Sequence, residues 1–195
     1  MLITKRPNHF RPTHDSLWGL CSMILDFPKW MRNTPMIEIG SYTGDSTQIF
    51  WMYFDPIIAI DPHTWHMAPM QSNEEVAELF KNNTEWRGIK HIKALSHDAL
   101  SKSEYLLQFP AFVSCVYIDA DHSYKAARQD ILDAWPLICD DGYICGHDYG
   151  LNTPGAIASQ QDGVKQAVDE IFGKPDRLYE DTSWCVQKKE GRKII

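Results

Sequence analysis

The chain has 195 residues, of which 44% are hydrophobic and 23% are charged, and its 19 basic and 26 acidic side chains give a formal net charge of −7. These proportions exclude extended disorder and predict one globular domain, because a chain of this length buries roughly 70% of its unfolded surface. The acidic balance argues against a broad nucleic-acid-binding face. We divide the predicted domain, residues 1–195, into an N-terminal segment with a helix (1–34), a core (35–188) and a tail (189–195).

Cysteine usage and hydropathy indicate where the protein acts. Five cysteines stand singly in apolar stretches, without a C-x-x-C pair. This distribution is typical of a reduced intracellular protein and argues against a disulfide framework or a structural zinc site. No apolar run reaches the roughly 18 residues of a membrane span, and the first residues lack the apolar stretch of a signal peptide. We therefore expect a cytoplasmic protein that does not associate with membranes.

Helical and β-branched apolar patterns alternate along most of the chain. A first helix is predicted over 16–27, with Asp15 or Ser16 as its N-cap and Pro28 at its end. Strict alternation of strand and helix predicts right-handed crossovers and a doubly wound α/β domain with a parallel sheet. The predicted strands are 36–39, 57–60, 89–94, 112–118 and 142–145, and the predicted helices between them are 46–53, 74–82, 98–107 and 124–137.

The end of the chain breaks this alternation. A helix is predicted over 163–172, and two strands over 176–180 and 183–187 are joined by so few residues that they must form an antiparallel hairpin. We therefore predict a mostly parallel, seven-stranded sheet with a C-terminal antiparallel hairpin. Residues 150–161 form a Gly-, Asn-, Pro- and Ser-containing loop that is long enough to act as a lid.

Acidic residues follow the predicted strands where ligands of an open α/β sheet bind, at the carboxyl ends. After the first strand the chain has E-x-G-x-x-x-G, with Glu38, Gly40 and Gly44, whereas a dinucleotide site has G-x-G-x-x-G. A carboxylate at Glu38 repels a pyrophosphate and attracts a cation. Asp61, about 20 positions further along, fits an acceptor for the two ribose hydroxyls. A ligand with a ribose at one end and positive charge at the other fits S-adenosylmethionine. Taken alone, however, the glycines are compatible with a tight turn, and Asp61 is compatible with a helix N-cap.

Two segments carry a more specific resemblance. Residues 36–44, M-I-E-I-G-S-Y-T-G, resemble motif I of the class I S-adenosylmethionine-dependent methyltransferases, and residues 117–122, Y-I-D-A-D-H, resemble their motif IV. The chain is most similar to the caffeoyl-CoA and catechol O-methyltransferase branch and to small methyltransferases with I-D-x-D-H-S-Y followed by G-H-D-Y. Segments 163–170 and 182–184 also resemble that smaller group. The resemblance covers about residues 36–188 and implies a Rossmann-like methyltransferase fold.

The resemblance also implies a cofactor site at the strand ends. It places one group of residues at the methionine end of S-adenosylmethionine, an acid at the ribose and a short segment beside the adenine. The implied residues are Glu38, Gly40, Ser41, Gly44 and Ser46 at the methionine end, Asp61 at the ribose, Ser96 and His97 at the adenine, and Asp119.

The same resemblance leaves open whether the site binds a divalent metal. In the caffeoyl-CoA branch the metal is held by the acid that matches Asp119 and by an Asp-Asn pair, of which Asp148 matches the Asp. Tyr149 stands where the Asn is expected. His147 is either a replacement ligand or only a hydrogen-bonded histidine. The mostly oxygen donors indicate Mg²⁺ or another hard cation.

His122 stands where the O-methyltransferase branch has a catalytic lysine. Imidazole, with a reference pKa near 6.5, accepts a proton from a hydroxyl at neutral pH, and we expect Asp119 and Asp121 to raise that pKa and orient the ring. Alternatively, His122 and Ser123 only begin the next helix, with Ser123 as N-cap.

The sequence therefore predicts methyl transfer from S-adenosylmethionine to a hydroxyl of a small molecule, with His122 and Asp119 as catalytic residues. Two alternatives remain, a nicotinamide-dependent oxidoreductase and a non-catalytic protein that retains the cofactor pocket. We expect no nucleic-acid partner, and association into a homodimer is left open.

Overall fold

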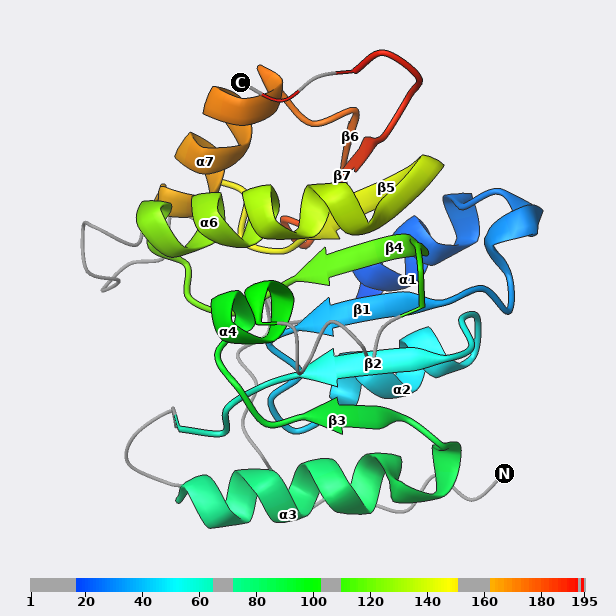
Figure 1. Cartoon of the computed structure of the whole chain (residues 1–195), viewed down its shortest axis with the longest axis vertical. Helices are drawn as coiled ribbons and strands as arrows, with labels where there is room; N and C mark the ends of the chain where they lie inside the picture. The colour runs from blue at the N-terminus through cyan, green and yellow to red at the C-terminus, as the bar shows by residue number, and fades with distance from the viewer. Residues whose placement is uncertain (1–16, 65–71, 103–109, 151–161, 193, 195) are drawn as a thin grey trace.

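The computed structural model describes residues 17–64, 72–102, 110–150, 162–192 and 194, and within them seven strands form one sheet. The strand order is β3-β2-β1-β4-β5-β7-β6 (Figure 1). β1 to β5 are parallel, and β7 is antiparallel to both β5 and β6. This arrangement confirms the predicted fold. The strands are β1 (Met36–Ile39), β2 (Ile57–Ile60), β3 (Lys90–Ile92), β4 (Val113–Ile118), β5 (Ile138–Gly146), β6 (Arg177–Leu178) and β7 (Trp184–Gln187).

Helices cover both faces of the sheet, with α4, α6 and α7 in front of it in Figure 1 and α1 and α2 behind. The helices are α1 (Trp18–Asp26), α2 (Asp45–Trp51), α3 (Asn73–Thr84), α4 (Ser96–Ser101), α6 (Tyr124–Ala134) and α7 (Gly163–Phe172), and 3-10 turns span Lys29–Met31, Glu85–Arg87 and Trp135–Leu137. Within the described residues, no helix has both the length and the apolar character of a membrane span.

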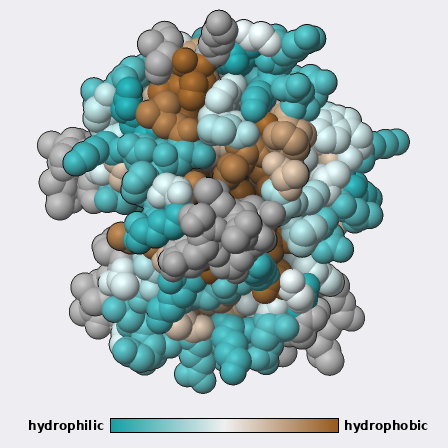
Figure 2. Space-filling view, viewed as in Figure 1, coloured by the Kyte–Doolittle hydropathy of each residue, from teal (hydrophilic) through white to brown (hydrophobic). Residues whose placement is uncertain are grey.

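Two hydrophobic clusters fill the space between the sheet and its helices, because strands buried on both faces send alternate side chains to opposite sides. Ile37 and Ile39 of β1 belong to one cluster together with Ile131 of α6. Met36 belongs to the other, together with Phe50 of α2. The face seen in Figure 2 is mostly hydrophilic, with a hydrophobic patch near its top in the region of α7.

Several element boundaries differ from the prediction, and the local sequence explains the two largest differences. β5 begins at Ile138, four residues before the predicted strand, because the polar Asp140-Asp141-Gly142 sequence resembles a turn although it lies inside the strand. The helix predicted to reach 137 ends at Ala134, and Pro136, which lacks an N–H donor, lies in a 3-10 turn. α4 begins at Ser96 and ends at Ser101, and residues 103–107 of the predicted helix lie outside the described part of the chain.

The start of α1 is capped by a residue from the other end of the sequence. The predicted caps, Asp15 and Ser16, lie outside the described residues, and Leu17 at the N-cap position makes no side-chain cap bond. Instead, the buried carboxylate of Asp181 accepts a hydrogen bond of 3.0 Å from the N–H of Leu20. A Cβ on Gly19 would lie 1.7 Å from Asp181 Oδ1. Gly19 therefore leaves room for this long-range cap.

We predict that Gly19→Ala destabilises the protein, although alanine is intrinsically the better helix former by about 1 kcal/mol. The added methyl group displaces Asp181, and loss of the cap should lower the free energy of unfolding by about 1–2 kcal/mol. Urea denaturation measures this difference. Ser22→Ala, at an exposed position of the same helix, is the control and should be neutral or stabilising. A Gly19→Ala variant as stable as the parent would contradict the cap.

Candidate active site

The loops after β1, β2, β4 and β5 leave the sheet at one edge, since these strands are parallel. The backbone ladder continues one residue beyond the strands, which fixes the start of each loop. The N–H groups of Gly40, Asp119 and His147 donate to the carbonyls of Ile60, Ile39 and Ile118 at 2.9, 2.8 and 3.1 Å. The predicted site residues after the strands are therefore held by the sheet itself.

Gly40 allows two of these loops to approach each other. Its φ is +87°, in the left-handed region, and a Cβ at this position would lie 2.0 Å from the carbonyl oxygen of Asp119. Any side chain would push the loop after β4 away from the loop after β1. The glycine thus brings the predicted cofactor loop next to Asp119.

Glu38 is completely buried and connects β1 to α2. The hydroxyls of Ser46 and Thr47, in the first turn of α2, donate to its two carboxylate oxygens, each at 2.5 Å. Burial raises the pKa of Glu38 to about 7, against the lowering effect of these two hydrogen bonds. The sequence prediction included Ser46 but missed Thr47, which its place beside Ser46 at the start of the helix could have indicated.

Asp61, the predicted ribose acceptor, is held in place by backbone groups. Its Oδ2 accepts the N–H of Tyr42 at 2.8 Å and its Oδ1 accepts the N–H of His63 at 2.7 Å. The imidazole of His91 lies 3.0 Å from the Asp61 carbonyl oxygen. Each carboxylate oxygen retains acceptor capacity beyond these single bonds. Asp61 is therefore fixed in orientation and can still accept two hydroxyl groups.

The loop after β1, which contains Gly40 and Gly44, has a buried hydroxyl without a partner among the described residues. Ser41 is 2% exposed, and its Oγ has no hydrogen-bond partner among the described residues. Buried polar atoms are normally hydrogen-bonded, so an unpaired one at a ligand edge indicates a missing partner. Gly44, with φ +79°, ends this loop at the N-cap position of α2.

Ser96 and His97, predicted to border the adenine, have side-chain partners on α6. Ser96 Oγ donates to Asp130 Oδ1 at 2.5 Å, and His97 Nδ1 lies 2.7 Å from Asp133 Oδ2. These bonds connect α4 to α6. Their contact with adenine stays a prediction.

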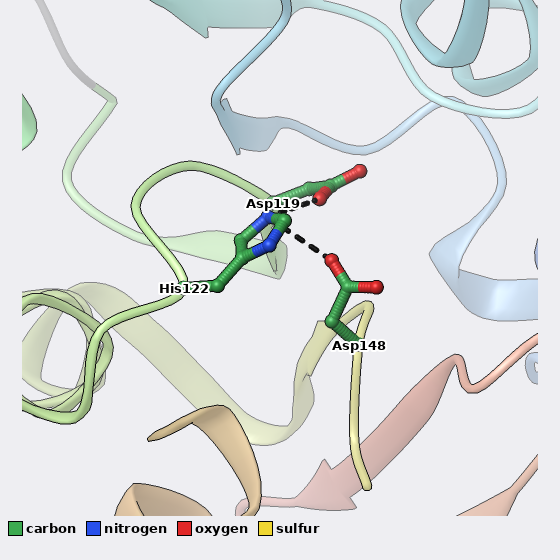
Figure 3. Close-up of side chains that lie close together, drawn as sticks. All are labelled: Asp119, His122 and Asp148. Carbon is green, nitrogen blue, oxygen red and sulfur yellow. Dashed lines mark ion pairs between the residues drawn. The ribbon is translucent and has the colours of Figure 1, made fainter. Parts of the chain in front are cut away.

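Asp119, His122 and Asp148 converge at the centre of the edge, from the loops after β4 and β5 (Figure 3). His122 Nε2 lies 3.4 Å from Asp119 Oδ1 and 3.0 Å from Asp148 Oδ2. Burial disfavours the charged imidazole, but the hydrogen bonds to the two carboxylates outweigh it and raise the pKa of His122 to about 10. His122 is therefore an imidazolium at neutral pH in this arrangement.

The His122 ring pairs with Asp119 and Asp148, and the expected neighbour Asp121 instead bonds the backbone. Its carboxylate accepts the N–H of Ser123 at 2.9 Å, and the Ser123 hydroxyl in turn caps α6 by accepting the N–H of Ala126 at 3.4 Å. Asp148 takes the place expected for Asp121. Ser123 is thus the helix cap, as the alternative interpretation held, while the His122 side chain faces the site.

A divalent cation has a suitable set of donors here. Asp119, His122 and Asp148 each offer one ligand atom, and these atoms lie within 4.8 Å of one another. His147 is outside this group, with its Nδ1 3.1 Å from Asp148 Oδ1. The Tyr149 hydroxyl donates to Asp169 at 2.6 Å, on α7, and so does not replace the missing Asn. The structure therefore places His122, and not His147, beside both candidate metal carboxylates.

The seven-stranded, mostly parallel sheet with its C-terminal antiparallel hairpin matches the Rossmann-like methyltransferase fold. The chain belongs to the methyltransferase domain family, whose sequence profile matches residues 37–149. This match confirms the methyltransferase class predicted from the sequence and does not favour the nicotinamide-dependent alternative. No curated protein matches the sequence.

Solved structures share the fold at low sequence identity. An O-methyltransferase from Bacillus cereus in complex with S-adenosylhomocysteine (SAH) has a TM-score of 0.60 and 14% identity, over 89% of this chain and 81% of its own. The N-methyltransferase NodS from Bradyrhizobium japonicum, also with SAH, has a TM-score of 0.55 and 12% identity, over 88% and 86%. A phosphoethanolamine N-methyltransferase from Haemonchus contortus gives 0.60 and 12%, over 90% and 43%. Because both oxygen and nitrogen acceptors occur among them, these structures establish the fold and leave the acceptor open.

We predict that Glu38 lowers stability as the pH rises. Its carboxyl has a pKa of about 7 when folded, against 4.5 ordinarily, so the unfolded chain ionises first. Relative to Glu38→Gln, the parent protein should lose about 3 kcal/mol of unfolding free energy between pH 4.5 and 7 and no more above pH 7. Chemical denaturation across this range measures the difference. Glu85→Gln, at an exposed site, should leave the pH dependence unchanged, and parallel pH profiles for the parent and Glu38→Gln would refute the prediction.

Proposed function

We propose that the protein transfers the methyl group of S-adenosylmethionine to a hydroxyl of a small molecule. The observation that carries this proposal is the His122 imidazole held between Asp119 and Asp148, on the loop whose Asp119 backbone lies against Gly40. A methyl transferase mainly has to hold the acceptor atom about 3 Å from the methyl group and remove its proton. Once it has lost its proton, His122 meets the second of these needs.

The cofactor would bind across the loops after β1 and β2. Asp61 would accept the ribose hydroxyls with its remaining acceptor capacity, and the buried Ser41 hydroxyl would gain a partner. Glu38 lies beneath this loop and would ionise as a cationic ligand arrives, because nearby positive charge favours a carboxylate. The SAH complexes of the Bacillus cereus and Bradyrhizobium japonicum proteins support a cofactor of this type.

His122 would serve as the general base, provided that its proton is removed before catalysis. In the described arrangement, the hydrogen bonds to Asp119 and Asp148 keep His122 protonated. A divalent cation bound by these two carboxylates would neutralise them and polarise the acceptor oxygen. Without the two negative charges, burial lowers the pKa of His122 toward the range of a base. In this proposal His122 would act as the base, and Asp119 and Asp148 would hold the cation and the acceptor.

We predict that Asp61→Ala weakens SAH binding by about 100-fold, because each of the two ribose hydroxyls loses a charged acceptor worth about 1.5 kcal/mol. Isothermal titration calorimetry measures the affinity. Asp98→Ala, which removes an exposed carboxylate paired with Lys102 on α4, is the control and should bind SAH as the parent does. Unchanged affinity of Asp61→Ala would remove Asp61 from the ribose site.

We predict that His122→Ala lowers methyl transfer by about 10²–10⁴-fold, the usual contribution of a general base. Transfer is measured as SAH release with a panel of phenols, catechols and sugars. The variant should bind SAH, and also Mn²⁺ by electron paramagnetic resonance, as the parent does. Asp148→Asn should lose Mn²⁺ binding. Loss of Mn²⁺ binding in His122→Ala would make His122 a ligand instead of a base, and undiminished transfer would exclude it from the mechanism.

A further inference from the structure

Thr182, in the turn between β6 and β7, contacts the backbone that carries Asp148. The N–H of Asp148 donates to Thr182 Oγ1 at 3.2 Å, and the N–H of Tyr149 donates to the Thr182 carbonyl at 3.1 Å. One residue therefore holds two successive amides of the loop after β5, although 34 positions of sequence separate it from Asp148.

Both partners adopt an unusual backbone conformation. Asp148 has φ +61° and Thr182 has φ +69°, in the left-handed region that residues other than glycine seldom occupy. Such a conformation costs on the order of 1–3 kcal/mol and persists only where surrounding contacts hold it. If Asp148 relaxed to an extended φ, its side chain would leave the loop in another direction. The amide bonds to Thr182 oppose that change.

The turn that carries Thr182 is itself firmly anchored. The buried Asp181 carboxylate accepts the N–H of Leu20 in α1 and the N–H of Ser183, both at 3.0 Å. The Trp184 indole N–H donates to the His147 carbonyl at 3.2 Å. The loop is consequently held at three successive residues by one rigid turn.

Glycine at position 146 allows the indole to come this close. A Cβ on Gly146 would lie 2.9 Å from the ring of Trp184. The last residue of β5 is therefore fitted to the same turn that holds the loop after it.

We propose that Thr182 is a positioning residue of the active site, whose hydroxyl holds Asp148 in the left-handed conformation and thereby aims its carboxylate at His122. The inference rests on the proposed function, since it requires Asp148 to take part in methyl transfer. Thr182 acts only through Asp148. The antiparallel hairpin thus supports the catalytic edge in addition to completing the sheet.

Two substitutions separate this role from a merely structural one. Thr182→Val keeps the β-branched shape and removes the hydroxyl, while Thr182→Ser keeps the hydroxyl. Thr34→Val is the matched control, because Thr34 also bonds through its hydroxyl, to Ser114, but lies at the amino ends of the strands. If amide protection and activity are lost only in Thr182→Val and are retained in Thr182→Ser, the effect is specific to the hydroxyl.

Two nuclear magnetic resonance signals report the geometry without an acceptor. The amide of Asp148 should exchange at least about tenfold faster in Thr182→Val, whereas the amide of Tyr149, which donates to the Thr182 carbonyl, should keep its protection. The low-field N–H proton of His122, hydrogen-bonded to Asp148, should broaden or disappear in Thr182→Val. It should remain in Thr182→Ser and Thr34→Val. The calorimetric affinity for SAH should stay within about twofold, since the cofactor loops are untouched.

Activity gives the third readout and separates the two hypotheses. Thr182→Val should lower kcat by about 10–100-fold, as expected when the partner of an active-site carboxylate is lost, and adding it to Asp148→Asn should lower kcat no further. Unchanged amide exchange and an unchanged His122 signal in Thr182→Val would overturn the inference. Asp148→Asn with undiminished methyl transfer would instead overturn the proposed function.

Discussion

The ion cluster of Asp119, His122 and Asp148 is the interaction on which the rest of the site depends. Two carboxylates at a partly buried edge are unfavourable unless a positive charge lies between them, and the imidazolium of His122 supplies it. His147, on the far side of Asp148, adds a second imidazole whose pKa is raised to about 9, because the hydrogen bond to that carboxylate outweighs burial. Asp148 is thus shared by two imidazoles, and its pKa lies well below its ordinary value because their hydrogen bonds outweigh burial.

Much of the fold follows from local patterns in the sequence. The strands at Met36–Ile39 and Ile57–Ile60 and the helix at Gly163–Phe172 match the prediction to the residue. In each case a short apolar block or an amphipathic repeat is bounded by a proline, a glycine or a polar turn, so that one structure satisfies every local preference. The first part of β5 was missed because the polar Asp140-Asp141-Gly142 sequence resembles a turn, whereas pairing of Ile138 with Val113 of β4 places this segment in the sheet.

The candidate site likewise contains residues that local sequence predicts and contacts that it does not. Residues directly after a strand, such as Glu38, Asp61 and Asp119, could be placed from the sequence because a parallel sheet brings its carboxyl ends together. Contacts made by distant segments could not. Nothing local in the sequence indicates that Thr182 would hold Asp148 or that Asp181 would cap α1, since a hydroxyl or a carboxylate in a turn has many equally good partners.

Raised pKa values at the two ends of the site, of a carboxyl at Glu38 and of an imidazole at His122, give the net charge of −7 a more specific meaning. Glu38 holds its proton more tightly than an exposed carboxyl, while His122 holds a positive charge between two acids. Much of the acidity at this edge is consequently neutralised before any ligand binds. A cationic cofactor favours ionised Glu38, and neutralisation of Asp119 and Asp148 favours neutral His122, so each binding event would release a proton. Under the proposed function, the same acidic edge would therefore suit a stable ligand-free fold and, once occupied, would provide a negative charge beneath the cofactor and an unprotonated base beside the acceptor.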